Sequence, residues 1–419
     1  MNNPKSQSVL FPLIIIGSVF FILGFITWLN GMLIPYLKIS CELSNFQALF
    51  VTFSFYISYT LMALPSSIVL EKIGFKNGMS VGLWTMAFGA LIFIPAAYTR
   101  EYIYFLLGLF VLGSGMALLQ TAVNPYVTIL GPIESAAKRI SIMGVANKVA
   151  GAIAPLVLAL FIIQEGDEQI LDNIANMSTQ ARELFLNTLA LRVIEPYLVI
   201  TLVLFLLGIF IRYIKLPDVK ENINTKEETS STTSKTNIWQ FPHLWLGVMT
   251  LFFYVGVEVI AGDTIIQYAK NTGLPISEAK VFTSYTMLAM LVGYFIGIVA
   301  IPKYLSQNKA LGFSAILGIL FSLLALFTNG ITSVTFIALL GLANALVWPA
   351  IWPLALNGLG QFINKGSAFL IMAISGGAIL PLLWGRLSDL FNSQQAYWIL
   401  PPVYLIIYFY SVKGFKLKA

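Results

Sequence analysis

The sequence predicts an all-α membrane protein in which twelve transmembrane helices form two six-helix halves. Three observations carry this prediction: an apolar composition, a series of helix-length runs with few charges, and a repeat between the two parts of the chain. Of the 419 residues, 58% are hydrophobic and 10% are charged, whereas soluble globular chains have about 25% charged residues. These charges are too few to cover a water-facing surface, which excludes a soluble domain, a disordered chain and a coiled coil.

Apolar runs long enough to cross a bilayer follow one another along the chain. A hydrocarbon core of about 30 Å requires roughly 20 apolar residues in a helix, whereas strands of a β-barrel would show about ten residues of alternating pattern. The run 310–364 is long enough for two helices and has a polar break at 328–333. Three further runs are shorter or interrupted by a charge, and with them the spans number twelve. The predicted spans are 10–37, 43–70, 77–99, 102–133, 140–164, 193–211, 241–269, 281–302, two within 310–364, 366–385 and 390–412.

The distribution of lysine and arginine predicts the orientation of these spans. With a cytoplasmic amino end, 16 of the 24 basic residues fall on the inner side, seven on the outer side and one, Lys148, within the membrane. Basic residues are enriched in short cytoplasmic loops, so we expect a multi-pass protein with both termini in the cytoplasm. The net charge of +6 therefore reports topology, and no nucleic-acid partner is expected. The amino end lacks the cleavage-site pattern of a signal peptide.

A polar, charged stretch separates the two halves. Lysine, glutamate, threonine and serine crowd the segment 212–235, a composition typical of a flexible linker. We therefore expect an N-terminal six-helix half at 1–214, a cytoplasmic linker at 215–240 and a C-terminal six-helix half at 241–419.

The two halves repeat each other. Residues 24–38 align without gaps with residues 256–270, and residues 150–156 match residues 376–382. The first pair of segments lies in spans one and seven, and the second pair in spans five and eleven. Such duplication characterises secondary transporters, whose substrate site lies between the halves near the membrane midplane.

Several motifs resemble those of one transporter family. They are Asn-Pro-Tyr-Val-Thr-Ile-Leu-Gly-Pro at 124–132, Phe-Tyr-Val-Gly at 253–256, Asn-Gly-Leu-Gly-Gln at 357–361, Lys-Gly-Ser at 365–367 and Gly-Gly-Ala-Ile at 376–379. These motifs resemble the fucose:proton symporter family, a sugar-transporting branch of the major facilitator superfamily that includes L-fucose permease and bacterial glucose/galactose transporters. The resemblance covers nearly the whole chain. It implies the major facilitator fold, a place in the bacterial inner membrane and the import of a monosaccharide.

The loop after the second span resembles a degenerate form of a superfamily loop motif. Glu71 stands where that motif usually has aspartate, and Lys72 and Lys76 supply the basic groups. In the superfamily such acidic and basic groups help to latch the cytoplasmic ends of the helices. The resemblance therefore implies a cytoplasmic gate formed by Glu71, Lys72 and Lys76.

Two departures from the family leave the coupling mechanism open. The family has carboxylates, to which its proton coupling is attributed, at the positions of Gly31 and Gln120, and neither residue can titrate. In the internal repeat Gly31 aligns with Asp263, which is expected in the outer half of the membrane as a coupling group or as a solvated residue near the outer mouth. Sodium symport, proton symport through Glu258 or Asp263, and uncoupled uniport all remain open.

Lys148 and Glu258 are predicted near the middle of the membrane. At 1.5 Å per residue, Lys148 lies about 13 Å beyond Arg139, and Glu258 lies about 18 Å before Lys270. A charge at a helix centre costs on the order of 2.5–3.5 kcal/mol by insertion scales, so a charged residue there indicates a function or a structural partner. One interpretation is that Lys148 lines the cavity and donates to sugar hydroxyls while offsetting Glu258. The other is that Lys148 forms a structural ion pair or snorkels to the cytoplasmic edge.

Amide and tryptophan side chains complete the candidate substrate site. Gln120 and Asn124 lie one turn apart on one helix face, where amides suit a ring of hydroxyls or link helices to each other. Trp348 and Trp352 are also one turn apart, and they either stack on a sugar or pack in the core. The candidate substrate-binding residues are Asn30, Gln120, Asn124, Asn147, Lys148, Glu258, Asn344, Trp348, Trp352 and Asn357.

These features together predict a secondary active transporter. The sequence has no catalytic triad, metal-spaced cluster or P-loop, so we expect neither an enzyme nor a metal site, and no cofactor beyond a co-transported sodium ion or proton. The expected substrate is a hexose such as glucose, galactose, mannose or fucose, imported by alternating access by a monomer in the lipid bilayer. The alternatives are an uncoupled sugar uniporter, a drug or metabolite antiporter of the same fold, and a non-transporting sugar receptor.

Overall fold

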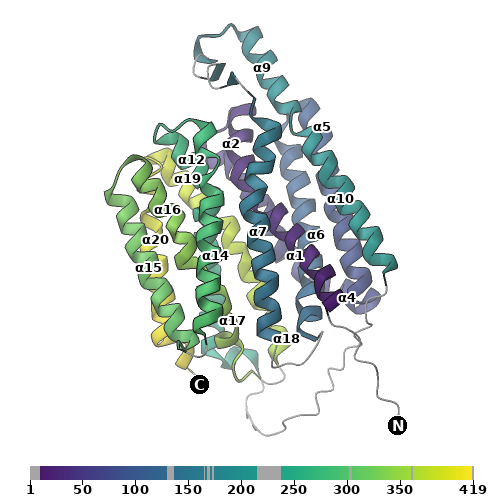
Figure 1. Ribbon diagram of the computed structural model, residues 1–419, viewed down its shortest axis with the longest axis vertical. Coiled ribbons are helices and arrows are strands. Elements are labelled where there is room, and N and C mark those ends of the chain that lie inside the picture. The colour runs from purple at the N-terminus through teal and green to yellow at the C-terminus, as the bar shows by residue number, and fades with distance from the viewer. Residues whose placement is uncertain are drawn as a thin grey trace.

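Long helices run from one end of the molecule to the other and form two groups that lie side by side (Figure 1). The computed structural model describes residues 10–129, 136–164, 166–167, 170–171, 174–214, 237–301, 304–359 and 362–417. Within these residues, twelve helical segments are long and apolar enough to cross a membrane. The predicted all-α membrane fold with twelve spans is therefore confirmed.

The helices α1 to α10 build the first six spans. Helix α4 packs against α6 and α10, and α1 packs against α7. Their bounds are α1 Leu10–Trp28, α2 Asn30–Ser40, α3 Asn45–Ala48, α4 Phe50–Leu91, α5 Phe93–Thr99, α6 Tyr102–Ile129, α7 Ala136–Ile162, α9 Thr179–Leu191 and α10 Ile194–Tyr213.

The helices α11 to α20 build the last six spans. Helix α15 packs against α16 and α20, and α11 packs against α19. Their bounds are α11 Pro242–Asp263, α12 Ile265–Asn271, α13 Ile276–Ala279, α14 Phe282–Ala300, α15 Gln307–Phe327, α16 Gly330–Asn344, α17 Val347–Leu356, α18 Ile363–Met372, α19 Gly376–Leu390 and α20 Leu400–Val412.

The two groups of helices meet along an interface that runs the length of the bundle. Helix α7 packs against α14, and α4 packs against α19. Helix α1 begins and α20 ends at the same end of the bundle, as an even number of spans requires, while α9 projects from the opposite end (Figure 1). We call the end that carries α9 the outer end, following the predicted orientation.

Spans one and seven, predicted as single helices, are each broken in their outer half. Span one is interrupted at Leu29, between α1 and α2, and span seven at Thr264, between α11 and α12. The two breaks fall within one turn of each other when the repeats are aligned. The hydroxyl of Thr283 on α14 donates to the Gly262 carbonyl at 2.7 Å beside the second break. Broken helices are tolerated within a membrane where neighbouring groups satisfy the freed backbone in this way.

Spans two and three are joined by a kink where the sequence predicts a short loop. The element α4 consists of two helices that meet at Gly74, whose backbone is non-helical with φ +77°. Glycine adopts this left-handed conformation without the steric penalty of a side chain. The predicted limits 43–70 and 77–99 are thereby corrected to Asn45–Leu70 and Lys72–Thr99.

Most of the predicted linker at 215–240 lies outside the described residues. Its end forms a short 3-10 helix at Ile238–Gln240, directly before α11. The domain limits on either side of the linker stay a prediction.

Candidate functional site

An ion pair joins the two halves of the bundle. The Lys148 ammonium on α7 lies 2.8 Å from Oε1 of Glu258 on α11, and the two side chains are only 9% and 12% exposed. Lys148 therefore does not snorkel to the cytoplasmic edge, and both charges are buried between the halves, as their central positions in the sequence predict. A buried pair of this kind stabilises the closed interface only if it stays complete, because either partner alone would be an uncompensated charge.

Trp28 forms one wall of this charged centre. The Lys148 ammonium lies 4.5 Å from the centre of the Trp28 ring, which is the geometry of a cation–π contact. The indole is wedged between Gly151 on α7 and Gly262 on α11, where an added Cβ would approach ring atoms to 2.4 Å and 2.2 Å. The sequence does not single out Trp28, because aromatic residues are common in apolar spans and only the fold brings it against glycines of two other spans.

Polar aromatic residues continue the site on α4 and α6. The Gln120 amide donates to the Tyr59 hydroxyl at 2.9 Å, and the rings of Tyr59 and Tyr56 stack with 6.2 Å between their centres. Tyr56 lies against Gly377 of α19, in the opposite half. Gln120 thus belongs to a polar cluster at the interface. The Asn124 side chain lies outside the described residues.

A second polar cluster surrounds Asn344 at the end of α16. Its amide oxygen accepts from the Tyr404 hydroxyl at 2.9 Å, and its backbone carbonyl accepts from Tyr254 at 3.1 Å. Tyr254, Tyr404 and Tyr294 all lie within electrostatic reach of Glu258. The structure therefore brings Asn344 and Glu258 into one polar network, although 86 positions separate them in the sequence.

The breaks in spans one and seven each hold a buried polar side chain. Asn30 and Asp263 are 1% and 0% exposed. Neither the Asn30 amide nitrogen nor either Asp263 oxygen has a hydrogen-bond partner among the described residues. The interpretation of Asp263 as a solvated residue near the outer mouth is therefore wrong. Counting residues from Lys270 gives the depth of Asp263 along its helix but takes no account of the other half, which covers it.

Polar contacts close the outer end between the halves. The Asp389 carboxylate, at the end of α19, accepts from the backbone amides of Asn45 and Phe46 at 3.0 Å and 2.8 Å. The Lys38 ammonium donates to the Asn45 side-chain oxygen at 2.7 Å, and Gln267 of α12 donates to the same oxygen. The sequence does not single out Asp389, because its partner is the start of a short helix on another span, which leaves no local pattern beside Asp389.

Asn147 and the two tryptophans make contacts other than the ion pair. The Asn147 amide donates to the Phe20 carbonyl at 3.3 Å, which links α7 to α1. The rings of Trp348 and Trp352 stack on each other with 5.4 Å between centres, on α17 at the inner end of span ten.

Asn357 is exposed and follows the end of α17. His243 bonds to its backbone carbonyl at 2.8 Å. The structure therefore does not bring Asn357 together with Lys148 and Glu258.

The predicted cytoplasmic gate is only partly described. Lys72 is exposed and Lys76 is half-buried, and among the described residues neither forms an ion pair; the Glu71 side chain lies outside that part of the chain. The neighbouring Asn77 accepts from Arg212 at 2.9 Å, which fastens this turn to the inner end of α10. The gate stays a prediction.

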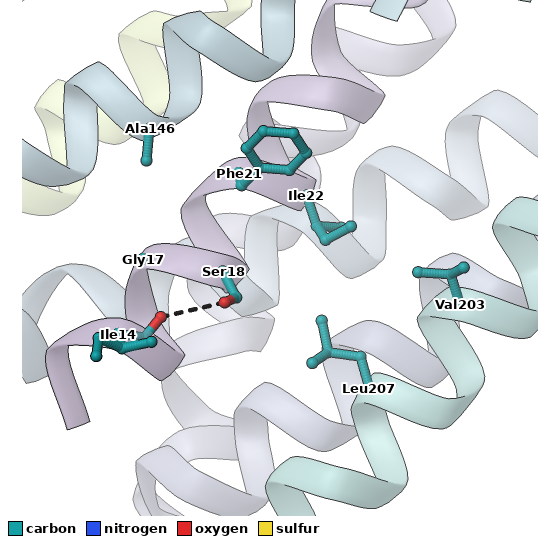
Figure 2. A pocket seen from close by; sticks show the side chains of 8 residues that line it. All are labelled: Ile14, Gly17, Ser18, Phe21, Ile22, Ala146, Val203 and Leu207. Atoms are coloured by element: carbon teal, nitrogen blue, oxygen red, sulfur yellow. Dashed lines mark hydrogen bonds between the residues drawn. The ribbon is translucent and has the colours of Figure 1, made fainter. Parts of the chain in front are cut away.

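A groove between α1, α7 and α10 does not have the chemistry of a sugar site (Figure 2). Its volume is about 460 Å³, and its lining is apolar apart from Ser18. The Ser18 hydroxyl is already donated to the Ile14 carbonyl at 3.1 Å. A polyhydroxylated ligand would lose its water hydrogen bonds here without replacement, so this groove is suited to apolar chains such as those of lipids.

The charged centre, by contrast, can satisfy a ring of hydroxyls. Lys148 supplies donors, Glu258 supplies acceptors, and the tyrosines and amides around them supply both. The face of Trp28 offers an apolar surface beside these groups. Among the described residues, no group of three or more His, Cys, Asp or Glu side chains could hold a metal ion.

Twelve spans in two repeated halves, with a buried polar site between them, define a secondary transporter. The chain belongs to the major facilitator superfamily, whose family model matches residues 16–380. Members of this family are transporters, and this protein is a multi-pass membrane transporter and not an enzyme.

Individual relatives of the chain include named sugar transporters. The chain is 36% identical to a glucose/galactose transporter of Brucella abortus biovar 1 (strain 9-941), over 99% of this chain and 98% of that protein. It is 29% identical to the L-fucose-proton symporter of Escherichia coli (strain K12), over 92% of this chain and 88% of that protein. A crystal structure of the major facilitator superfamily transporter FucP in the outward conformation superposes with a TM-score of 0.73 at 27% identity, covering 97% of this chain and 99% of the other.

Proposed function

We propose that the protein imports a hexose across the bacterial inner membrane by alternating access. The observation that carries the proposal is the buried ion pair of Lys148 and Glu258 beside the Trp28 ring, held between the two halves. Relatives that match nearly the full chain and bear the names glucose/galactose transporter and L-fucose-proton symporter support a monosaccharide as the substrate. Orientation with cytoplasmic termini and a monomeric state are parts of the same proposal.

Sugar binding can replace the contact within the ion pair and so link the two halves. In the absence of sugar, Lys148 and Glu258 satisfy each other at 2.8 Å. A sugar hydroxyl both donates and accepts, so it replaces the direct contact by two charge-assisted hydrogen bonds, which are among the stronger kinds. The sugar then connects α7 to α11, and it binds best when both halves surround it.

The site argues against an antiporter for apolar drugs. Such a cavity would be lined by aromatic and aliphatic groups with few hydrogen-bonding partners. Here two charges and the amides of Gln120 and Asn344 lie among the tyrosines. A polyhydroxylated substrate uses these groups, whereas an apolar one would leave them unpaired.

The first prediction tests the charged centre by uptake in proteoliposomes. Lys148→Met and Glu258→Gln are each expected to lower hexose uptake at least tenfold, because each removes a sugar contact and leaves the other charge without its partner. The measurement is uptake and counterflow of labelled glucose, galactose, mannose and fucose. Lys413→Met, which removes an exposed lysine after α20, serves as the matched control and is expected to transport normally.

The outcomes separate the competing functions. Near-normal hexose transport in both variants would remove the pair from the substrate site. Binding without counterflow in the unmodified protein would identify a receptor, and transport of apolar cations without sugar transport would identify an antiporter.

A further inference from the structure

Asp263 is a buried carboxyl group without a partner. It is the last residue of α11, directly before the break at Thr264, and it is 0% exposed. Neither of its oxygens has a hydrogen-bond partner among the described residues. Groups of this kind are rare within a membrane and carry a function when they occur.

In the part of the chain that the structure describes, Asp263 forms no ion pair. The titratable side chains in electrostatic reach are Tyr56 of α4 and Glu258 of α11 itself, and the Thr52 hydroxyl of α4 approaches without meeting hydrogen-bond geometry. Lys148 of α7, across the interface, is already bound to Glu258.

Two basic side chains on neighbouring elements have other surroundings. Lys38 of α2 donates to Asn45 at the outer end, and Arg386 of α19 is exposed. Among the described residues, none of these basic groups forms an ion pair with Asp263.

This arrangement distinguishes the two candidate coupling carboxyls. Glu258 has Lys148 as a partner at 2.8 Å in the closed interface. An ionised Asp263 would be a buried charge with a like charge on its own helix and no counter-ion, which is strongly unfavourable. Closure over Asp263 is therefore favoured by its neutral, protonated form.

The position of Asp263 connects its protonation to movement of the halves. The side chains that approach it from the other half, Thr52 and Tyr56, lie on α4. The contacts of Asp389 with the start of α3 close the outer end above this region. When these contacts open, the halves separate and Asp263 meets the outer water.

We propose that Asp263 binds the proton that is co-transported with the sugar, and that protonation of this carboxyl favours closure of the outer end over the sugar-loaded site. This inference rests on the proposed sugar transport and names its coupling ion. From the outer side, a hydronium ion transfers its proton to the Asp263 carboxylate and leaves water. After the inner side opens, the carboxyl returns that proton to cytoplasmic water and becomes a carboxylate again.

The internal repeat accounts for an acid in this half alone. Asp263 aligns with Gly31 of span one. A Cβ added to Gly31 would lie 2.7 Å from the Thr283 hydroxyl, which is occupied in bonding the Gly262 carbonyl. The closed interface therefore has no room for a carboxylate at position 31, whereas position 263 holds one.

The test compares two modes of transport in the full-length protein. Asp263→Asn keeps the shape of the side chain and fixes it in a neutral state. We expect this variant to retain sugar counterflow, which needs no driving ion, and to lose accumulation of sugar driven by an imposed pH gradient by tenfold or more. The unmodified protein is expected to accumulate sugar with a pH gradient and to take up protons with the sugar, as followed by a trapped pH dye.

The possible results distinguish a failure of the proposed sugar transport from a failure of the proposed role of Asp263. Absence of counterflow in the unmodified protein would overturn the proposed sugar transport. Counterflow together with full pH-driven accumulation in Asp263→Asn would overturn the assignment of Asp263. Accumulation driven by a sodium gradient and not by a pH gradient would show that a sodium ion is the partner. Asp263→Ser, a smaller neutral variant, gives the same readout if the asparagine variant does not fold.

Discussion

At the scale of single residues, the charged centre depends on two glycines, which have no side chain beyond hydrogen. Gly151 and Gly262 lie against opposite sides of the Trp28 indole, and each approaches it more closely than a Cβ would allow. The ring is thereby held at 4.5 Å from the Lys148 ammonium. Two glycines on different spans thus fix the orientation of a residue on a third span.

Gly151→Ala is expected to lower sugar affinity several-fold and to destabilise the protein by about 1–3 kcal/mol, the usual cost of overpacking. The added methyl group must displace the Trp28 ring, because the indole lies 2.4 Å from the Cβ position. Thermal unfolding in detergent and sugar-dependent stabilisation measure the two effects. Gly144→Ala on the same helix is the control, since its Cβ would meet Tyr294 at an ordinary 3.9 Å. Equal stability and equal sugar-dependent stabilisation of the two variants would contradict the role of Gly151 in positioning the Trp28 ring.

At the scale of elements, one side chain of α19 holds the start of α3 across the interface. The Asp389 carboxylate accepts from two backbone amides of the four-residue helix Asn45–Ala48. A carboxylate at a helix start is favourable through these hydrogen bonds and through the helix dipole. The contact therefore latches the halves together at the outer end.

Asp389→Ala is expected to shift the protein towards an open outer end. The loss is about 1 kcal/mol at such an exposed site, which corresponds to roughly a fivefold change in population. The readout is the labelling rate of a cysteine at position 267, in a Cys41→Ser background, by a membrane-impermeant maleimide, because Gln267 is 2% exposed at this contact. Arg386→Ala, an exposed change on the same helix, should leave the rate unaltered. An unchanged rate in Asp389→Ala would show that other contacts keep the end closed.

The sequence predicts the spans far better than it predicts their interruptions. Length and hydropathy place all twelve spans, because crossing a bilayer imposes a minimum apolar run. The breaks at Leu29 and Thr264 change one or two residues in an apolar stretch, so they leave no trace in hydropathy. They depend on groups such as the Thr283 hydroxyl, which come from a distant span.

The sequence predicts the charged residues of the candidate site but not its aromatic residues. Lys148 and Glu258 are found from the sequence because a charge within an apolar span is conspicuous. Trp28 and Tyr254 are not found from the sequence, because aromatic residues are common in apolar spans. Only the fold brings these two to the charged centre. Asn357 has the right chemistry for a sugar site but lies beyond the end of its helix.

At the scale of the whole molecule, two helix bundles meet along one interface. Packing of α7 on α14 and of α4 on α19 joins them, with the ion pair between α7 and α11. These contacts come from side chains within the spans. The spans of the two halves therefore contact each other directly.

Two separate fragments, cut at position 225 in the predicted linker, are expected to assemble into a functional transporter when they are expressed together. Each fragment carries one half of the ion pair and its own six spans. Co-purification on a tag at one fragment and hexose uptake measure the assembly. Introducing Lys148→Met into the first fragment should weaken co-purification, and full recovery of that variant fragment would mean that the ion pair contributes little to the interface.

The buried ion pair also determines where the membrane voltage acts. Lys148 and Glu258 cancel each other, so with a protonated Asp263 the loaded site carries no net charge and its inward movement is electroneutral. After proton release, the empty site carries one negative charge, and its return towards the outside is favoured by a negative interior. A full charge crossing gains about 2.3 kcal/mol per 100 mV. Voltage should therefore accelerate the return of the empty carrier and leave the sugar-carrying step unaffected.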